Sequence, residues 1–555
     1  MRRSQVSGVA HVRRQLRHRP LPPRLLYLAA LVGGLSALGL GWYTLGGTAD
    51  SAGGSRYVEG VVGQPRLPNP LLAEPDSVDA DLVALLFSGL TRIEGDGTAQ
   101  PDIAEHWDVT PDGLTYTFHL RPDVYWHDGQ RVSAADVAFT IALVQAEGFD
   151  GPPGLAAQWA GATVSVIDAE TLEVRLPAPS ASFLTRASLG ILPEHLLGSL
   201  APGELRAAPF NRSPVGAGPY RLVRVDAASV LLERHPGYHL GIPALELFEL
   251  RLFRDEESLL AALGRGDIDG ALLAEDATAA RREQAAAQPG VAITELPSSG
   301  YTALYMNNQR DPLNDPQLRR ALAAAIDRGA LLASMDLAAR GRVGDGPVVP
   351  GSWAHAAAEW PSPAEADELF EAAAWTPGED GVLQRAGQRL ELELVTNASP
   401  ARQALAEAVA EQLRARGVHV VVAVLPSAEL VTRRLAPRDY ELAIFGWETE
   451  VDPDPYGAWH TSQIVPPGAN VSGYHDPLAD ALLEAARQTL DVAERRELYQ
   501  RFTERFVETA PSLVLHYPAR LYAHPARLEE LDEGLLFQAA SRFRDVHLWR
   551  LADAD

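Results

Sequence analysis

The stretch RLELELVTNASPARQALAEAVAEQLRARGVHVVVAVLPSAELVTRRLAPRDYELAIFGW (389–447) decides the fold. Three of its segments are rich in Leu, Val and Ile, which predicts buried strands. The segments between them are helical in character, and the first helix begins at Ser399, with proline in its first turn, and ends at Gly417. Strands that alternate with helices form a parallel βαβαβ unit, so we expect residues 301–515 to be α/β. The predicted strands are 389–397, 418–425 and 440–447.

The first half of the chain mixes this pattern with antiparallel strands. Residues 245–273 repeat strand, helix and strand on a smaller scale. The segment 113–129 alternates polar and apolar residues, as a half-buried strand does. Ser133, with Asp136 three residues later, predicts a capping box at the start of a helix. Two further segments each predict a pair of strands around a tight turn, 164–176 and 220–234.

The composition excludes several classes of chemistry. The 555 residues include no cysteine and no lysine. The chain therefore has no thiol nucleophile, no thiolate metal site and no lipid-modified cysteine anchor. It also has no lysine for a Schiff base or for an ordinary phosphate-binding loop. A length of 555 residues favours two or three domains.

The N-terminus indicates export. Seven of the 48 basic residues lie within residues 1–24, which hold no acidic residue. An apolar segment follows at 25–46, long enough to cross a bilayer, and the arginines before it keep its start in the cytoplasm. Residues 47–56 are the expected flexible linker. We expect a membrane anchor, and the alternative is a signal peptide cleaved near Ala49.

The rest of the chain is strongly acidic, because it holds all 73 acidic residues. Such a surface repels nucleic acid and anionic membranes, and it favours a soluble monomer. We therefore expect no nucleic-acid partner.

The candidate ligand site follows the third strand of the βαβαβ unit, because ligands of open α/β sheets bind beyond the carboxyl ends of strands. Aromatic rings and carboxylates are concentrated there, as a pocket for an amine-bearing or ring-bearing solute requires. The alternative is that Trp447 belongs to the core and the acids face water. The candidate residues in this segment are Gly446, Trp447, Glu448, Glu450, Asp452 and Trp459.

The case for an enzyme is weak. A carboxylate pair could act in acid–base chemistry, but no pattern holds two of them at a defined separation. The sequence contains no His-Glu-x-x-His and no Gly-x-Ser-x-Gly motif. The histidines lack the spacing of metal ligands, so we expect no metal and no cofactor. They are His106, His119, His127, His460, His475 and His516.

Four stretches in order resemble one family, the extracellular solute-binding proteins of ABC importers of the oligopeptide- and dipeptide-binding type, family 5. The most specific is PDIAEHWDVTPDGLTYTFHLRPDVYWHDGQRVSAADVAFT (101–140). The others are SPVGAGPYRL (213–222), YMNNQRDPLNDPQLRRALAAAIDRGAL (305–331) and GWETEVDPDPYGAWHTSQ (446–463). The resemblance covers about residues 57–550.

This resemblance implies an α/β, two-lobed periplasmic-binding-protein-like fold of type II, in its large three-subdomain variety. Lobe one would be 57–298, with 516–555 returning to it, and lobe two 299–515. The protein would capture a peptide or peptide-like small solute by lobe closure and deliver it to ABC permease subunits with their ATPases.

The resemblance also implies particular ligand contacts. In peptide-binding relatives, an aspartate three residues after the loop tryptophan holds the α-ammonium group, and this position is Glu450 here. Tyr301 and Phe87 match stretches that flank the cleft, although Phe87 fits core packing equally well. Two other functions remain open: a membrane-tethered extracellular sensor domain, and a hydrolase that uses the acidic loop.

Overall fold

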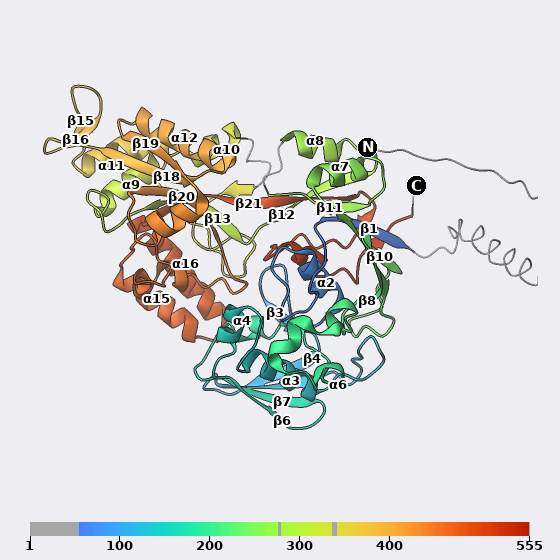
Figure 1. Ribbon diagram of the computed structural model, residues 1–555. Helices are drawn as coiled ribbons and strands as arrows, with labels where there is room; N and C mark the ends of the chain where they lie inside the picture. The colour runs from blue at the N-terminus through green and yellow to red at the C-terminus, as the bar shows by residue number, and fades with distance from the viewer. Residues whose placement is uncertain (1–54, 276–278, 336–340, 554–555) are drawn as a thin grey trace, which may run out of the picture. The chain divides into compact units, whose positions relative to one another are not determined.

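The computed structural model describes residues 55–275, 279–335 and 341–553 (Figure 1). The predicted basic segment and the apolar segment lie outside these residues, as does most of the predicted linker. Arg56, its last residue, already begins the first strand, β1 (Arg56–Val62). Within the described part of the chain, no helix is both long and apolar enough to cross a bilayer.

One mixed sheet of twelve strands organises the fold. Its longest strand, β21 (Ser512–Pro525), pairs first with β13 (Gly300–Met306) and further along with β12 (Val291–Pro297). Short β14 (Gly341–Val343) pairs with the middle of β21. Figure 1 shows β21 between the two groups of strands that it joins. The strand order along the main path is β19-β18-β20-β13-β21-β11-β1-β10-β9-β8.

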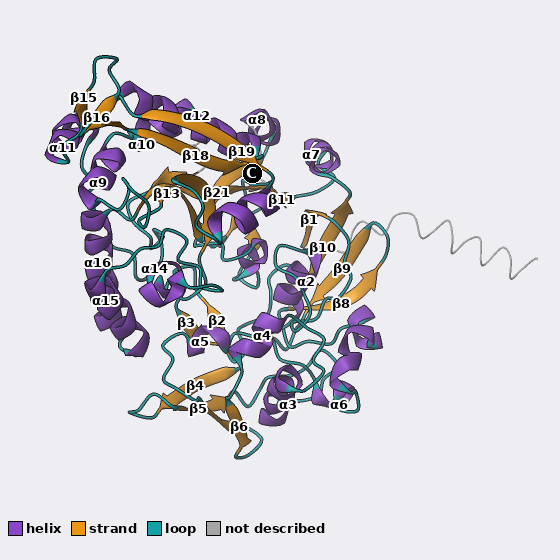
Figure 2. Ribbon diagram, turned by 60° about the vertical axis from the view of Figure 1, so that its left-hand side comes forward, coloured by secondary structure: helices purple, strands orange, loops and turns teal. Residues whose placement is uncertain are grey.

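The predicted βαβαβ unit is confirmed. Helix α12 (Pro400–Ala415) lies along the strands on either side of it in sequence (Figure 2). Gly417 has a φ of +83°, and a Cβ there would lie 2.7 Å from the carbonyl oxygen of Gly381, so glycine is required where the chain leaves the helix. The three strands are mutually parallel: β18 (Glu391–Asn397), β19 (His419–Leu425) and β20 (Leu442–Glu448).

The shorter strand–helix–strand pattern is also confirmed. β10 (Leu247–Phe253) and β11 (Gly270–Leu272) both pair with β1 in parallel, and α7 (Glu256–Gly264) connects them. Antiparallel β8 (Tyr220–Val225) and β9 (Ser229–Arg234) complete this end of the sheet, as the sequence predicts.

A separate sheet of four antiparallel strands has the order β4-β5-β7-β6. The predicted capping box is present where Ser133 and Asp136 start α3 (Ala134–Gln145). The strands of this sheet are β4 (Ala104–Val109), β5 (Thr115–Leu120), β6 (Thr163–Val166) and β7 (Thr171–Arg175). Other elements used below are α2 (Val78–Leu86), α5 (Phe183–Arg186), α15 (Pro477–Gln488) and α16 (Val492–Thr509).

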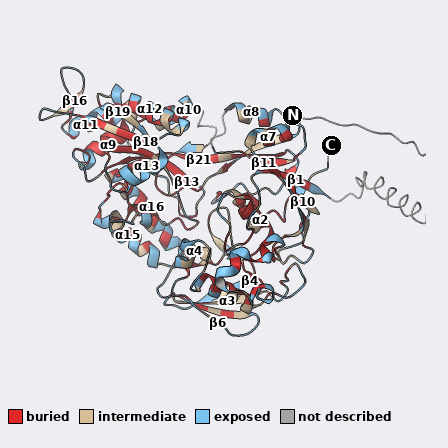
Figure 3. Cartoon of the chain, viewed as in Figure 1, coloured by how far each residue is buried: buried red, intermediate tan, exposed pale blue. Residues whose placement is uncertain are grey.

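The buried side chains form two sets of clusters. One set combines residues before 297 with residues after 520, and the other combines residues 301–517 with Leu535. Trp549 packs against Tyr57 and Phe248, with ring centroids 5.5 and 6.3 Å apart. The end of the chain therefore returns to the core formed by its first half. Figure 3 shows strands such as β18 and β13 largely buried, whereas exposed positions lie along α15 and α16.

A buried ionic network fixes this return. Arg542 donates to the carboxylates of Glu59, on β1, and Asp81, on α2, at 2.9 Å in each contact. Tyr522 on β21 donates to Glu59 at 2.9 Å. Burial raises the pKa of Glu59 to about 7, although Arg542 opposes the shift. Asp81, which accepts both terminal nitrogens of Arg542, is therefore the stronger partner.

We predict that Arg542→Met lowers the free energy of unfolding by about 3–5 kcal/mol, because it leaves two buried carboxyl groups without their cation. Urea denaturation followed by tryptophan fluorescence measures the change. Arg550→Met is the control, because Arg550 also contacts two acids, Glu529 and Glu530, but at the surface. Equal shifts of the urea midpoint in both variants would contradict the importance of the buried network.

Candidate functional site

Two cavities adjoin the end of β20. The strand-side cavity, of about 430 Å³, is lined by the residues that enter β13, by the end of β20 and by the middle of β21. The loop-side cavity, of about 700 Å³, is lined by the end of α2, the segment after α5 and residues 448–452. Glu448, Phe537 and Gln538 line both cavities, so the two are neighbouring parts of one cleft.

Most of the predicted contacts line this cleft, and strand pairing explains why. β13 runs antiparallel to β20, with Tyr301 opposite Trp447 and Gly300 opposite Glu448. The structure places Tyr301, Gly446, Trp447 and Glu448 at the strand-side cavity and Phe87, Glu448, Glu450 and Asp452 at the loop-side cavity.

Trp459 is the predicted residue that lines neither cavity. It is buried, and its ring lies 6.0 Å from that of Tyr305 and 4.7 Å from that of Phe506. Its position is that of a core residue behind the cleft. Tyr301 is buried as well, so it presents little of its surface to the cleft.

Asp452 and Glu450 differ in their surroundings. The carboxylate of Asp452 accepts bonds from both terminal nitrogens of Arg495 on α16, at 3.1 and 2.8 Å, and both side chains are only 5% exposed. Glu450 is exposed. Asp452 therefore holds the loop in place, whereas the carboxylate of Glu450 is accessible to a solute.

Arginines that were not predicted from the sequence balance these acids. Burial lowers the pKa of Arg186 at the end of α5, and the negative charges of Glu450 and Asp452 oppose this shift. Burial also lowers the pKa of Arg402, an effect opposed by Glu448 among others. The arginines that line the cavities are Arg92, Arg186, Arg402, Arg520 and Arg544.

Arg402 has a sequence signal that could have identified it. It lies in the first turn of α12, directly after β18, and β18 is parallel to β20. The carboxyl ends of neighbouring parallel strands meet at one edge, so residues after both strands share a site. A Cβ on Gly446 would lie 2.5 Å from Nη2 of Arg402, so the glycine makes room for the guanidinium. No comparable sequence pattern identifies Arg186 as a residue of the cleft.

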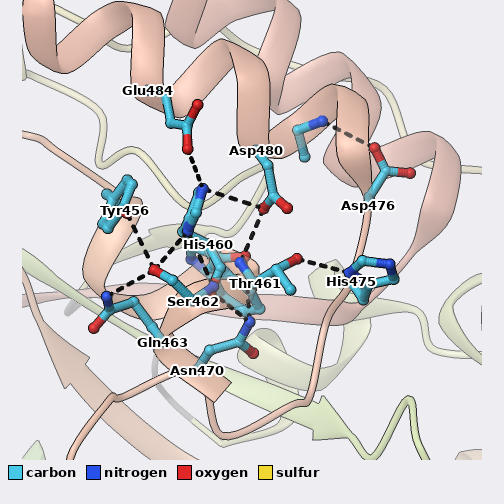
Figure 4. Close-up of polar contacts among 12 residues, drawn as sticks. Tyr456, His460, Thr461, Ser462, Gln463, Asn470, His475, Asp476, Asp480 and Glu484 are labelled. Carbon is cyan, nitrogen blue, oxygen red and sulfur yellow. Dashed lines mark hydrogen bonds and ion pairs between the residues drawn. The ribbon is translucent and has the colours of Figure 1, made fainter. Parts of the chain in front are cut away.

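The chain beyond Asp452 is held by a dense polar network (Figure 4). Asn470 is fully buried and donates to the carbonyl oxygens of Trp459, His460 and Tyr474. His460 Nδ1 accepts the backbone N–H of Ser462 at 3.1 Å, a helix-capping contact, and its Nε2 lies 3.3 Å from Glu484 on α15. This network supports the loop from behind.

Comparison with known proteins decides the family. The model of the bacterial extracellular solute-binding proteins, family 5 (middle), matches residues 98–464. The chain belongs to this family. The family resemblance inferred from the sequence motifs is thus confirmed, and the chain is a solute-binding protein and not an enzyme.

Family 5 relatives match over most of the chain. The oligopeptide-binding protein AppA of Bacillus subtilis is 27% identical over 517 residues, 90% of this chain and 92% of that protein. The solved structure of AppA from Bacillus subtilis with a nonapeptide is similar at a TM-score of 0.64 and 25% identity, covering 90% of this chain and 99% of that chain. The solved structure of NikZ from Campylobacter jejuni in complex with Ni(L-His) is similar at a TM-score of 0.65 and 26% identity. The match covers 89% of this chain and 99% of that chain. The mixed α/β periplasmic-binding fold is shared throughout.

We predict that Asp452→Asn lowers the free energy of unfolding by about 3–5 kcal/mol, because Arg495 remains buried without a counter-charge. Glu450→Gln is the matched control in the same loop, and we expect it to stay within about 0.5 kcal/mol of the unmodified protein. Urea denaturation of both variants measures the difference. A stable Asp452→Asn variant would mean that the ion pair does not hold the loop.

Proposed function

We propose that this protein is the solute-binding subunit of an ABC importer and that it captures peptides between two lobes. Lobe one comprises residues 57–298 with 516–555, and lobe two comprises 299–515. The division of the buried clusters supports these boundaries, with Tyr517 and Leu535 as exceptions among the described residues. The lobes belong to the large, three-subdomain variety of the type II fold.

The cleft next to β20 is the observation that carries the proposal. Its walls come from both proposed lobes: Phe87 and Arg186 from lobe one, and Trp447 and Glu450 from lobe two. A solute that contacts both walls binds the closed arrangement better than the open one, so binding shifts the equilibrium toward closure. The two cavities, of about 430 and 700 Å³, are of the size that holds a small ligand.

The charges in the cleft favour a zwitterionic peptide as the solute. Glu448 and Glu450 are exposed carboxylates that suit an ammonium group, and we propose that Glu450 holds the α-ammonium of the peptide. Arg402 and Arg520 offer guanidinium groups for carboxylates at the strand-side cavity. AppA, named as oligopeptide-binding, and its nonapeptide complex support the same class of solute.

The partners and location follow from the same proposal. The segment 25–46 exports the chain and anchors it to the outer face of the bacterial cell membrane, without a cysteine-linked lipid because the chain has no cysteine. The acidic protein works as a monomer, binds no nucleic acid and delivers its solute to permease subunits with their ATPases. The name of the Escherichia coli relative SapA, a probable ABC transporter periplasmic-binding protein, supports this assignment.

Mass spectrometry of the solute that co-purifies with the protein tests the proposal. We expect unmodified peptides, and a synthetic peptide of the same sequence should stabilise the protein by about 2.7 kcal/mol at one hundred times its dissociation constant. The NikZ complex makes a nickel–histidine chelate the control ligand. Stabilisation by the chelate and by no peptide would contradict the peptide assignment.

A variant tests the role of Glu450. We predict that Glu450→Gln weakens peptide binding about tenfold or more, a change of ~1.4 kcal/mol, because the ammonium group loses its counter-charge. Isothermal titration calorimetry with a free peptide and with its N-acetylated form measures this. The acetylated peptide should bind both proteins equally. A tenfold loss for the acetylated peptide as well would mean that Glu450 does not contact the ammonium group.

A further inference from the structure

We infer that His106, Asp108 and His119 bind one divalent transition-metal ion, with Zn²⁺ as the physiological candidate, on the outer face of the four-stranded sheet. Two imidazoles and one carboxylate are a ligand set that selects Zn²⁺, Ni²⁺ or Cu²⁺ over Mg²⁺ and Ca²⁺. None of the three residues lines the cleft, so this site is separate from the proposed peptide site.

Strand register brings the ligands together. His106 on β4 lies directly opposite His119 on β5, and their rings stack with centroids 4.4 Å apart. Side chains alternate between the faces of a strand, so Asp108 shares the face of His106. The neighbouring pair, Trp107 and Phe118, points to the opposite face, where Phe118 is fully buried in the core. Strand register thus places next to each other two histidines whose separation in sequence is not that of metal ligands.

The distances suit a metal after small side-chain rotations. The ligand atoms of the three residues all lie within 4.8 Å of one another, and His119 Nε2 is 3.3 Å from a carboxylate oxygen of Asp108. A tetrahedral Zn²⁺ with bonds of about 2.1 Å holds its ligands roughly 3.4 Å apart. Asp108 is 77% exposed and His119 is 35% exposed, so both can rotate freely enough to close this gap. Three protein ligands leave a fourth position for water or another donor.

Acidic side chains lie near these ligands, with Arg175 farther along the same face. Asp168, in the turn between β6 and β7, interacts electrostatically with His119. Glu173 on β7 lies opposite Thr117 of β5, two residues from His119 and therefore on the same face of the sheet. Figure 2 shows β4, β5 and β6 together at the edge of the view, far from the group around β13 and β21. A bound metal would join two adjacent strands and stabilise the folded state.

The test uses full-length protein without a histidine tag, stripped with a chelator and titrated with ZnCl₂ in the absence of free histidine. Calorimetry should show one Zn²⁺ per chain, and His106→Gln or His119→Gln should each weaken binding at least tenfold. His419→Gln is the matched control, because His419 is an exposed histidine on β19 and should not affect Zn²⁺ affinity. Mg²⁺ should not compete.

Two outcomes would overturn this inference: the absence of a saturable 1:1 complex, or equal Zn²⁺ affinity in the unmodified protein and in the His106→Gln/His119→Gln double variant. Equal melting temperatures of the metal-free variants and the unmodified protein confirm that the substitutions leave the fold intact. Peptide titrations of the same variants separate the two sites, because loss of the metal should leave peptide affinity unchanged.

Discussion

The fold depends on the backbone hydrogen bonds of a single long strand, β21 (Ser512–Pro525). Its 14 residues pair with β13 and β14 in one half of the molecule and with β11 and β12 in the other. Two hydrophobic cores that could otherwise separate therefore share one strand. The ladder with β13 is irregular between Thr302 and Ala303. The two proposed lobes are thus connected through the strand pairing of β21.

The buried carboxylates stabilise the walls of the cleft, whereas the exposed carboxylates are accessible from it. Glu59, Asp81 and Asp452 are buried next to arginines that arrive from distant parts of the chain. These pairs fix where the walls of the cleft lie, and removing one partner leaves an uncompensated buried charge. Glu448 and Glu450, by contrast, are exposed at the end of β20, where a solute can reach them. A pocket whose walls are already fixed loses little conformational entropy when it binds a solute.

Much of the fold was predictable because it rests on local patterns. The strands of the βαβαβ unit follow from runs of Leu and Val, and Gly417 marks the end of its helix. The loop after β20 is predicted to be the ligand site because ligands of α/β sheets bind at the carboxyl ends of strands, and the structure places it beside two cavities. Local patterns also identified the capping box at Ser133 and the hairpin β8–β9.

The missed features depend on partners that are distant in sequence. Arg495 is 43 residues from Asp452, and Arg542 is 483 residues from Glu59. Arg186 reaches the cleft because the segment after α5 lies across the same cavity from residues 448–452. His106 and His119 become neighbours through strand register, so their separation in sequence does not have the spacing of a metal motif. Trp459 was predicted as a ligand contact because it is an aromatic residue near the predicted site, but it is buried in the core and lines neither cavity.

Closure of the cleft by its solute is the central claim, and a distance measurement tests it most directly. The natural absence of cysteine allows spin labels to be placed at two introduced cysteines, at exposed Glu147 in lobe one and exposed Glu368 in lobe two. Pulsed electron paramagnetic resonance then gives the distribution of distances with and without the peptide. Capture between lobes predicts a shift to a different, narrower distribution at saturating peptide. An unchanged distribution, with binding verified by calorimetry in the same sample, would contradict it.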